Sequence, residues 1–526
     1  MATMGFIKST ELDAQEETAS IMVPETFTHS IAFGQTGCGK TSSFIYPNLK
    51  NRLELGHGIL FYDYKGKEHL SVKVLAEMAG RLEDVVEIGK PWGKKINLVQ
   101  NMDEDELDKF FDVILKHGED SKYWQNSAKS LGQSLLKVFK AIEGFANAYE
   151  AVDNSVIGEY LVAFGFEYPT KRTLKSLVES CVTFERLGKF IEKLDKLVSK
   201  AESMIQRSAE KTLKNEVDVK KIKLRYKELI GAKEKLKATL ADTKKSLESF
   251  GKDSNENLTQ NIMGSLIAPL LSLAQNEAFN TNDFDIVSAL NEGKIVVVNV
   301  ESLSNAVVES LNNTILYELS KRTKSMNINP ISIFIDEVQR VLSKNADLPI
   351  DVFREAKVDL FLATQNSALL KEKLKEEKFD SLMGNLTQKY YFKSSSDEEL
   401  ESARELKLLE GFEYVCSDND YSSVRGSTPI FLDDDQKLTV EYKYQKKLNV
   451  LVDYLYEHKS KPYVLEYDSR LYKDNKVIAI DVKTKKERIL ESLNLENALY
   501  LEKEVNKLFA RVEETLNEDE EEYLAS

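Results

Sequence analysis

The sequence contains little cysteine and no long apolar run. Its three cysteines, Cys38, Cys181 and Cys416, lie far apart and form no C-x-x-C pair in a chain of 526 residues. This spacing excludes a disulfide framework and a cysteine-based zinc site, and we expect the thiols to stay reduced in a cytosolic protein. The chain shows no signal peptide and no apolar stretch of about eighteen residues, so we expect no membrane-spanning segment.

The sequence also has fewer basic residues than acidic ones. The formal net charge is −15, and an acidic run occupies residues 517–522. Such acidity argues against a protein that coats nucleic acid without specificity, although basic residues could still line the channel of a ring. The acidic run is interpreted as a solvated chain end. Hydrophobic content of 42% with 30% charged residues is otherwise typical of a globular protein.

The most informative motif is the octapeptide at residues 34–41, which matches G-x-x-x-x-G-K-[ST]. Glycines in this pattern let backbone N–H groups surround phosphate oxygens, while Lys40 would reach the β- and γ-phosphates and Thr41 would ligate Mg²⁺. The stretch 30–33 predicts a strand before the loop, and 41–49 predicts a helix whose N-terminus favours anions. We therefore expect ATP and Mg²⁺ to bind here. The predicted nucleotide-binding residues are Gly34, Gln35, Thr36, Gly37, Cys38, Gly39, Lys40, Thr41 and Ser42.

A second motif is an apolar strand, Ile331–Ile335, that ends in Asp336 and Glu337. Ligand sites of parallel α/β sheets lie at the carboxyl ends of the strands, which is where this pair would stand. We expect Asp336 to hold Mg²⁺ together with Thr41, and Glu337 to polarise the attacking water. Combined with the phosphate loop, the pair predicts ATP hydrolysis in addition to ATP binding.

Two further candidates for catalysis follow the acidic pair. Gln365 comes after the apolar stretch 360–364 and would lie beside the γ-phosphate. Arg354 is notable because only fourteen of the 72 basic residues are arginines. It would act in trans on the γ-phosphate of a neighbouring subunit; the alternative is a surface ion pair with Asp351 or Glu355. The predicted catalytic residues are Lys40, Glu337, Arg354 and Gln365.

Short apolar strands alternate with helical stretches over most of the chain, which is typical of an α/β fold with a parallel sheet. The alternation stops between residues 168 and 295. The candidate strands are Ile31–Phe33, Ile59–Tyr62, Ile295–Val300, Ile331–Ile335, Leu360–Ala363 and Lys389–Phe392.

The interrupted stretch predicts an all-helical insertion. Residues 189–230 contain neither glycine nor proline, and apolar residues recur at three- and four-residue steps from Leu187 to Ile205 and from Ile222 to Leu240. Two helices of about 30 residues each, folded back as an antiparallel hairpin, would bury these stripes against each other. The hairpin would be a structural arm or, alternatively, an arm that binds a partner. Towards the C-terminus, 438–444 and 477–482 alternate like strands.

The order of these motifs resembles the FtsK/HerA superfamily of ring-forming RecA-like translocases, and within it the TraG/TraD-type coupling proteins of conjugation and type IV secretion. Residues 63–68 are similar to the family's D-P-K-G-E element, with Tyr64 in place of proline and Lys67 inserted. Arg354 and Gln365 fall where the family has R-x-x-G and a sensor glutamine. Further similar segments are His29 before the loop, Asn97-Leu98, Tyr123–Ala128, Asn385–Phe392 and Asp397–Glu399.

The resemblance implies a RecA-like P-loop NTPase motor that assembles as a homohexamer and pumps DNA through a central pore. The expected domains are 1–150 and 257–430 for the motor, 151–256 for the helical insertion and 431–526 for a small C-terminal accessory region with an acidic tail. Coupling proteins usually begin with membrane-spanning helices, for which a phosphate loop at residue 34 leaves no room.

We therefore expect a cytoplasmic protein, or one held at the inner membrane by partners. Expected partners are DNA, further copies of the chain, and a relaxase or secretion-channel proteins. Alternatives are a soluble HerA-like ATPase, and a nucleotide-controlled docking switch that acts on protein partners. The complete Glu337, Gln365 and Arg354 set favours the motor, because a switch could discard the carboxylate that activates water.

Overall fold

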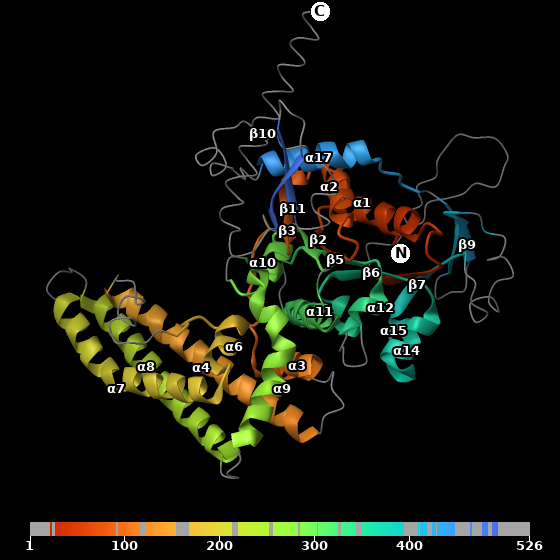
Figure 1. Cartoon of the computed structure of the whole chain (residues 1–526). Helices are drawn as coiled ribbons and strands as arrows, with labels where there is room; N and C mark the ends of the chain where they lie inside the picture. The colour runs from red at the N-terminus through yellow and green to blue at the C-terminus, as the bar shows by residue number, and fades with distance from the viewer. Residues whose placement is uncertain are drawn as a thin grey trace, which may run out of the picture. The chain divides into compact units, whose positions relative to one another are not determined.

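The computed structural model describes residues 22–23, 27–90, 93–115, 122–153, 168–212, 219–251, 256–281, 284–301, 303, 305–324, 328–342, 349–393, 409, 411–417, 423–427, 429–447, 463–464, 476–481 and 487–492. The chain forms two compact units. One comprises Met1–Ile96 with Asp283–Ser526 and is called the motor unit; the other comprises Asn97–Asn282 and is called the helical unit. Figure 1 shows their elements. Among the residues described, no helix combines the length and hydropathy needed to cross a bilayer.

The motor unit is built on a nine-stranded sheet in the order β3-β4-β2-β5-β6-β1-β7-β8-β9. All pairings from β3 to β7 are parallel, and β8 and β9 extend the edge antiparallel. The six predicted strands are all present. The strands are β1 (His29–Phe33), β2 (Gly58–Asp63), β3 (Val85–Ile88), β4 (Ile295–Asn299), β5 (Ile331–Ile335), β6 (Val358–Thr364), β7 (Leu386–Phe392), β8 (Tyr414–Ser417) and β9 (Ser423–Gly426).

The strand register brings distant motifs to one edge of the sheet. Phe33 of β1 pairs with Thr364 of β6, and Ile335 of β5 pairs with Leu362 of β6. Because these strands are parallel, the phosphate loop, the acidic pair and Gln365 all follow the carboxyl ends of adjacent strands. The phosphate-loop strand and the acidic-pair strand are separated by β6 alone, in a RecA-like P-loop fold.

Helices cover both faces of this sheet, so its central strands β1, β2, β5 and β6 are buried throughout. Helices α1, α2 and α17 lie on one face and α11, α12, α14 and α15 on the other (Figure 1). The helices of the unit are a π-helical turn (Thr41–Ile45), α1 (Tyr46–Glu54), α2 (Glu68–Met78), α10 (Ile286–Asn291), α11 (Asn305–Ser320), α12 (Val338–Val341), α13 (Ile350–Phe353), α14 (Ser367–Leu374), α15 (Glu376–Asn385) and α17 (Asp434–Lys447), with 3₁₀ turns at Leu82–Asp84 and Lys321–Lys324.

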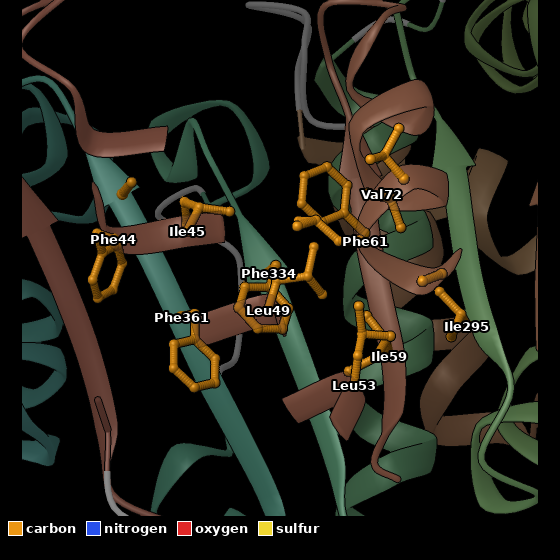
Figure 2. Packing of buried hydrophobic residues seen from close by; sticks show 14 of the residues in the cluster. Phe44, Ile45, Leu49, Leu53, Ile59, Phe61, Val72, Ile295, Phe334 and Phe361 are labelled. Atoms are coloured by element: carbon orange, nitrogen blue, oxygen red, sulfur yellow. The ribbon is translucent and has the colours of Figure 1, made fainter. Parts of the chain in front are cut away.

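A row of phenylalanines crosses the centre of the sheet beneath α1 (Figure 2). Phe61 of β2, Phe334 of β5 and Phe361 of β6 are register partners and fully buried. The rings of Phe334 and Phe361 stack with centroids 4.4 Å apart, and those of Phe61 and Phe334 lie 6.4 Å apart. Each such aromatic pair contributes about 0.5–1.5 kcal/mol beyond its buried area. The row holds together the strands that carry the predicted site.

Helix α17 occupies residues expected to be a strand. The alternation in 438–444 predicted a strand, and this prediction was wrong. The side chain of Asp433 accepts a hydrogen bond from the backbone N–H of Gln436 at 2.6 Å, which starts a helix. Val440 and Tyr444, four residues apart, then lie on one buried face. The expected strand at 477–482 is present as β11 (Lys476–Asp481), between β10 (Tyr463–Val464) and β12 (Glu487–Ser492).

A buried cluster of charges fastens α17 to the rest of the motor unit. The ammonium of Lys73, on α2, lies 3.0 Å from Glu87 of β3 and also pairs with Glu441 of α17. All three side chains are at most 1% exposed. The Lys73 ammonium also lies over the ring of Tyr444 at 4.0 Å. This lysine therefore joins α2 and β3 to α17, whose Glu441 is 368 positions away in the sequence.

The helical unit contains the predicted pair of long helices. Leu187, Leu194 and Ala201 are buried on α7, and Leu229 and Leu236 are buried on α8. Its elements are α3 (Glu104–Leu115), α4 (Lys122–Asp153), α6 (Leu174–Cys181), α7 (Phe184–Thr212), α8 (Val219–Gly251), α9 (Glu256–Gln275) and a 3₁₀ turn (Glu277–Phe279).

An ion pair of 2.7 Å between Asp195 of α7 and Lys244 near the end of α8 links the two helices. The two helices do not form an isolated arm, since α8 also packs along α4. The unit extends over Asn97–Asn282, whereas the expected insertion was 151–256. Helices α4 and α9 pack against the hairpin, and α3 packs in turn against α4 and α9, so the unit extends beyond the hairpin in both directions of the sequence.

Candidate nucleotide-binding site

The phosphate loop connects β1 to the helix that begins at Thr41. Gly39 has a φ of +97°, a left-handed conformation that glycine adopts without the strain of a side chain. The ammonium of Lys40 donates to the carbonyl oxygens of Gly34 at 2.5 Å and Gln35 at 3.1 Å. Burial raises the pKa of the Cys38 thiol, against the opposing effect of Lys40. Cys38 therefore stays a protonated thiol in the loop.

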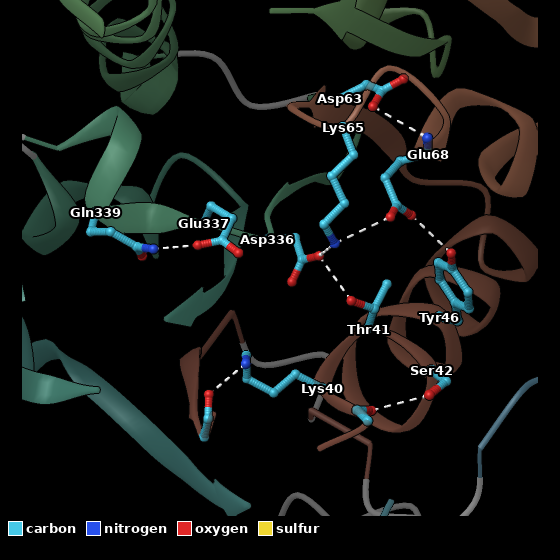
Figure 3. A network of polar contacts seen from close by, with 12 residues as sticks. Lys40, Thr41, Ser42, Tyr46, Asp63, Lys65, Glu68, Asp336, Glu337 and Gln339 are labelled. Atoms are coloured by element: carbon cyan, nitrogen blue, oxygen red, sulfur yellow. Dashed lines mark hydrogen bonds and ion pairs between the residues drawn. The ribbon is translucent and has the colours of Figure 1, made fainter. Parts of the chain in front are cut away.

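The loop and the acidic pair meet directly, although 295 residues separate the two side chains in sequence. The hydroxyl of Thr41 donates to Oδ2 of Asp336 at 2.8 Å (Figure 3). Lys65, in the loop after β2, donates to the same oxygen at 2.8 Å. Two donors therefore converge on one carboxylate oxygen, at the edge where parallel strands end.

Lys65 joins Asp336 to a second carboxylate, Glu68, which lies 3.3 Å from its ammonium. Burial alone would lower the pKa of Lys65, but the negative charges of Asp336 and Glu68 raise it above its ordinary value. Burial raises the pKa of Glu68, with Lys65 opposing the shift. The hydroxyl of Tyr46 donates to the other oxygen of Glu68 at 2.8 Å. Lys65 thus stays cationic beside the expected phosphate position.

Asp63 fixes the loop that carries Lys65. Its carboxylate, fully buried at the end of β2, accepts hydrogen bonds from the backbone N–H groups of Glu68 at 3.2 Å and His69 at 3.1 Å. It also bonds the ring of His69 at 2.8 Å. Burial would raise the pKa of Asp63, but His69 and Lys90 hold it below its usual range. The ionised carboxylate therefore stabilises the N-terminus of α2.

Glu337 stands next to Asp336 but points elsewhere. It lies at the start of α12 and is half-buried. Its side chain accepts a hydrogen bond from the amide of Gln339 (Figure 3). This bond orients the carboxylate that was predicted to polarise water.

Gln365 and Arg354 lie at opposite ends of β6. Gln365 follows the carboxyl end of this strand, on the same edge as the phosphate loop and Asp336. Arg354 precedes its first residue, at the opposite edge, and is exposed. A seven-residue strand is about 23 Å long. Five predicted residues, Lys40, Thr41, Asp336, Glu337 and Gln365, therefore gather at one edge, and Arg354 does not join them within the chain.

The alternative role of Arg354 as part of a surface ion pair is not seen. In the part of the chain that the structure describes, its side chain makes no ion pair with Asp351 or Glu355. The side chain is thus available on the surface of the motor unit.

The oxygen ligands at this edge fit Mg²⁺. Thr41 supplies a hydroxyl and Asp336 a carboxylate, 2.8 Å apart. Mg²⁺ prefers hard oxygen ligands and is commonly bound by one or two protein groups together with substrate phosphates and waters. Among the described residues no cluster of three or more His, Cys, Asp or Glu side chains forms a separate metal site.

Sequence reasoning missed several residues of this site. The resemblance of 63–68 to a family element marked the segment of Lys65, but its contact with Asp336 joins residues 271 positions apart. Phe412 also lies against the phosphate loop and contacts the ring of Phe431, and no sequence pattern marked either residue. The backbone N–H of Phe412 donates to the carbonyl of Cys38 at 3.1 Å.

Comparison with known families gives a match to one segment of the chain. Residues 330–438 match the family model described as the TraM recognition site of TraD and TraG. This segment is TraG/TraD-like. It begins just before β5 and contains Asp336, Glu337, Arg354 and Gln365, and it confirms the predicted resemblance there. No curated protein sequence matches the chain.

Solved structures of similar architecture include coupling proteins. The plasmid coupling protein TrwB in complex with the ATP analogue ADPNP shares 12% identity, with a TM-score of 0.48 over 81% of this chain and 91% of that one. TrwB with ADP and Mg²⁺ shares 12% identity at a TM-score of 0.40, over 77% and 80% of the two chains. VirB4 of Thermoanaerobacter pseudethanolicus shares 14% identity at a TM-score of 0.40, over 78% and 90%. At such identities the fold assignment rests on the strand order and phosphate loop of this chain itself.

Proposed function

We propose that the chain is an ATP-driven DNA translocase of the coupling-protein type, which hydrolyses ATP to move DNA or a nucleoprotein in conjugation, type IV secretion or a related mobile-element system. The observation that carries the proposal is the 2.8 Å contact between Thr41 and Asp336. It joins the phosphate loop to the acidic pair in the arrangement that P-loop NTPases use for Mg²⁺ and the β- and γ-phosphates. The TraG/TraD-like segment supports the coupling-protein type.

In this proposal the chain's own residues position the γ-phosphoryl group and stabilise its charge. Backbone N–H groups of the loop and the ammonium of Lys40 bind the phosphates. Thr41 and Asp336 hold Mg²⁺, which neutralises charge on the phosphate oxygens when it is bound. Glu337, oriented by Gln339, accepts a proton from the attacking water. Lys65 is a second fixed cation at this edge.

The position of Arg354 supports action between subunits. It lies beyond the edge of the sheet opposite the phosphate loop, so it cannot reach the nucleotide of its own chain. In a ring, that surface can face the phosphate loop of the next copy, where a guanidinium stabilises the charge of the transition state. We therefore propose a homo-oligomer, a hexamer by analogy with ring-forming translocases.

Partners follow from the matched family. It is described as a TraM recognition site, so we propose that residues 330–438 take part in recognising a TraM-like protein, in addition to DNA and a relaxase or secretion-channel component. The proposed location is the cytoplasm, with recruitment to the inner membrane through such partners.

The test is the steady-state ATPase rate with and without single- and double-stranded DNA, at two salt concentrations. A motor predicts a rate that DNA stimulates, with stimulation that falls as salt rises, because phosphate contacts release counterions. The Glu337→Gln variant should bind ATP but should not hydrolyse it. The Gln339→Glu variant, two residues further along, tests the contact that orients Glu337. A rate that DNA leaves unchanged would refute the translocase and favour a nucleotide switch acting on proteins.

A further inference from the structure

Two phenylalanines form an aromatic pair beside the phosphate loop. The rings of Phe412 and Phe431 lie edge to face, with centroids 5.0 Å apart. Phe431 is 66% exposed, the most exposed large hydrophobic side chain among the described residues, and Phe412 is half-buried. A single exposed ring needs no explanation. A pair of rings held beside a ligand site does need an explanation.

Backbone hydrogen bonds join the loop to Phe412 and to Ile430, the residue before Phe431. The N–H of Phe412 donates to the carbonyl of Cys38 at 3.1 Å, and the N–H of Ile430 donates to the carbonyl of Ser42 at 3.0 Å. A side-chain carbon added to Gly39 would lie 2.5 Å from the ring of Phe412, so the ring sits directly on the loop. Phe412 itself has a φ of +72°, a conformation that bulky residues rarely adopt. The chain thus holds this ring against the loop despite an unfavourable backbone conformation.

The pair lies toward the nucleoside end of the loop. Lys40 and the contact of Thr41 with Asp336 mark the end that takes the β- and γ-phosphates. Figure 3 shows Thr41 directed toward Asp336 and Ser42 directed away from it. The aromatic pair is joined to the loop at Cys38, Gly39 and Ser42. A nucleotide with its γ-phosphate near Asp336 would extend its base in this second direction.

We propose that Phe412 and Phe431 form the surface on which the purine base of the bound nucleotide stacks, with Phe431 making the outer contact. This subsite rests on the proposed binding of a nucleoside triphosphate at the phosphate loop. Stacking on a phenylalanine ring uses the π-face that every base has and carries no hydrogen-bond code. Adenine and guanine nucleotides therefore bind this surface with similar affinity.

The test compares Phe431→Ala with the wild-type chain by calorimetric titration of two ligands, a non-hydrolysable ATP analogue and inorganic tripolyphosphate, each with Mg²⁺. Stacking on an aromatic side chain predicts that the variant loses affinity for the nucleotide roughly tenfold. Affinity for tripolyphosphate, which has no base, should not change. Phe431→Trp should keep the affinity, and its fluorescence should be quenched by the nucleotide and not by tripolyphosphate. Phe184→Ala, which removes another exposed ring at 49% exposure, is the matched control.

Unchanged nucleotide affinity in Phe431→Ala would overturn the subsite, and so would an equal loss for both ligands, since that would show a distorted loop. If the wild-type chain and Phe431→Ala bind the nucleotide equally well, the subsite is refuted but the proposed ATPase is not. A wild-type chain that binds neither ligand overturns the phosphate site and the subsite together.

Discussion

Replacing Gly39 by alanine tests how closely the segment around Phe412 is packed on the phosphate loop. The new Cβ would lie 2.5 Å from Cδ1 and 2.8 Å from Cα of Phe412, and the second of these atoms belongs to the backbone. The aromatic ring of Phe412 could rotate away from the new Cβ, but its backbone can avoid the clash only if the whole segment moves. The substitution therefore displaces the segment that follows residue 410 from the loop.

Two costs add in this variant. An alanine at a φ of +97° costs about 1–2 kcal/mol of free energy of unfolding, because its Cβ crowds the backbone. Overpacking against a close neighbour costs about 1–3 kcal/mol more. Gly37→Ala provides the matched control: Gly37 has a φ of +84°, yet no atom lies within 4 Å of its added Cβ. It should therefore incur the first cost alone.

The assay is urea unfolding of both variants without nucleotide. We expect Gly39→Ala to lose roughly 2 kcal/mol more than Gly37→Ala, the middle of the overpacking range. Any gain from reducing the freedom of the unfolded chain is similar for the two substitutions and cancels in the difference. Equal losses would show that Phe412 does not lie on the loop in solution, and the reasoning would fail.

Three other predictions concern assembly, the buried charge cluster and pH. Arg354→Ala should lose ATPase activity, and mixing it with inactive Lys40→Ala should restore part of the rate, because each variant supplies what the other lacks. Urea unfolding of Lys73→Met should give a free energy of unfolding about 3–5 kcal/mol lower than wild type, because the variant lacks the ammonium that two buried carboxylates share. Burial lowers the pKa of His29 from 6.5 to about 4, so acid should destabilise the fold between these values by roughly 3 kcal/mol.

Each of these has its own control. Mixtures of Arg354→Ala and Lys40→Ala that stay inactive would argue against an arginine acting in trans. Lys443→Met removes the exposed ion pair with Glu77 between the same two helices, and should lower the free energy of unfolding by less than about 1 kcal/mol. If Lys73→Met lowers it by no more than Lys443→Met does, the buried cluster is contradicted.

The sign of the pH effect follows from proton binding. The unfolded state binds the extra proton of His29 below pH 6.5 and the folded state only near pH 4, so stability is present above 6.5 and falls as pH decreases. Protonation would also remove the acceptor for the N–H of Leu360. His29→Asn should reduce this slope in urea unfolding measured from pH 7 to 4.5, and an unchanged slope would exclude His29 as its source.

The central sheet could be predicted from the sequence because its parallel strands are buried on both faces and read as short apolar runs. Residues 331–335 and 360–363 are of this kind, the second lying inside β6. β3 was missed, since four residues with a glutamate between apolar positions give too short a pattern. α17 was misread because polar and apolar residues alternate by chance in 438–444, while the cap at Asp433 decides for a helix.

The candidate site was predicted as far as local motifs extend. Lys40, Thr41, Asp336 and Glu337 stand in short patterns whose chemistry is known. The contact of Lys65 with Asp336 and the position of Phe412 against Gly39 depend on tertiary packing between remote segments, which periodicity does not record. The limits of the helical unit were missed for the same reason, since a helix is assigned to a unit by what it packs against.

The position of β1 between β6 and β7 has a consequence for synthesis of the chain. β1 ends at Phe33, and its first partner strand begins at Val358. At about 5–20 residues per second, roughly 15 to 65 s pass before the ribosome supplies that partner. During this interval a strand that is buried in the folded protein has both edges open, while the local contacts of the helical unit can already form. The phosphate loop is therefore made long before β6 and β7, the strands that flank β1 in the folded sheet.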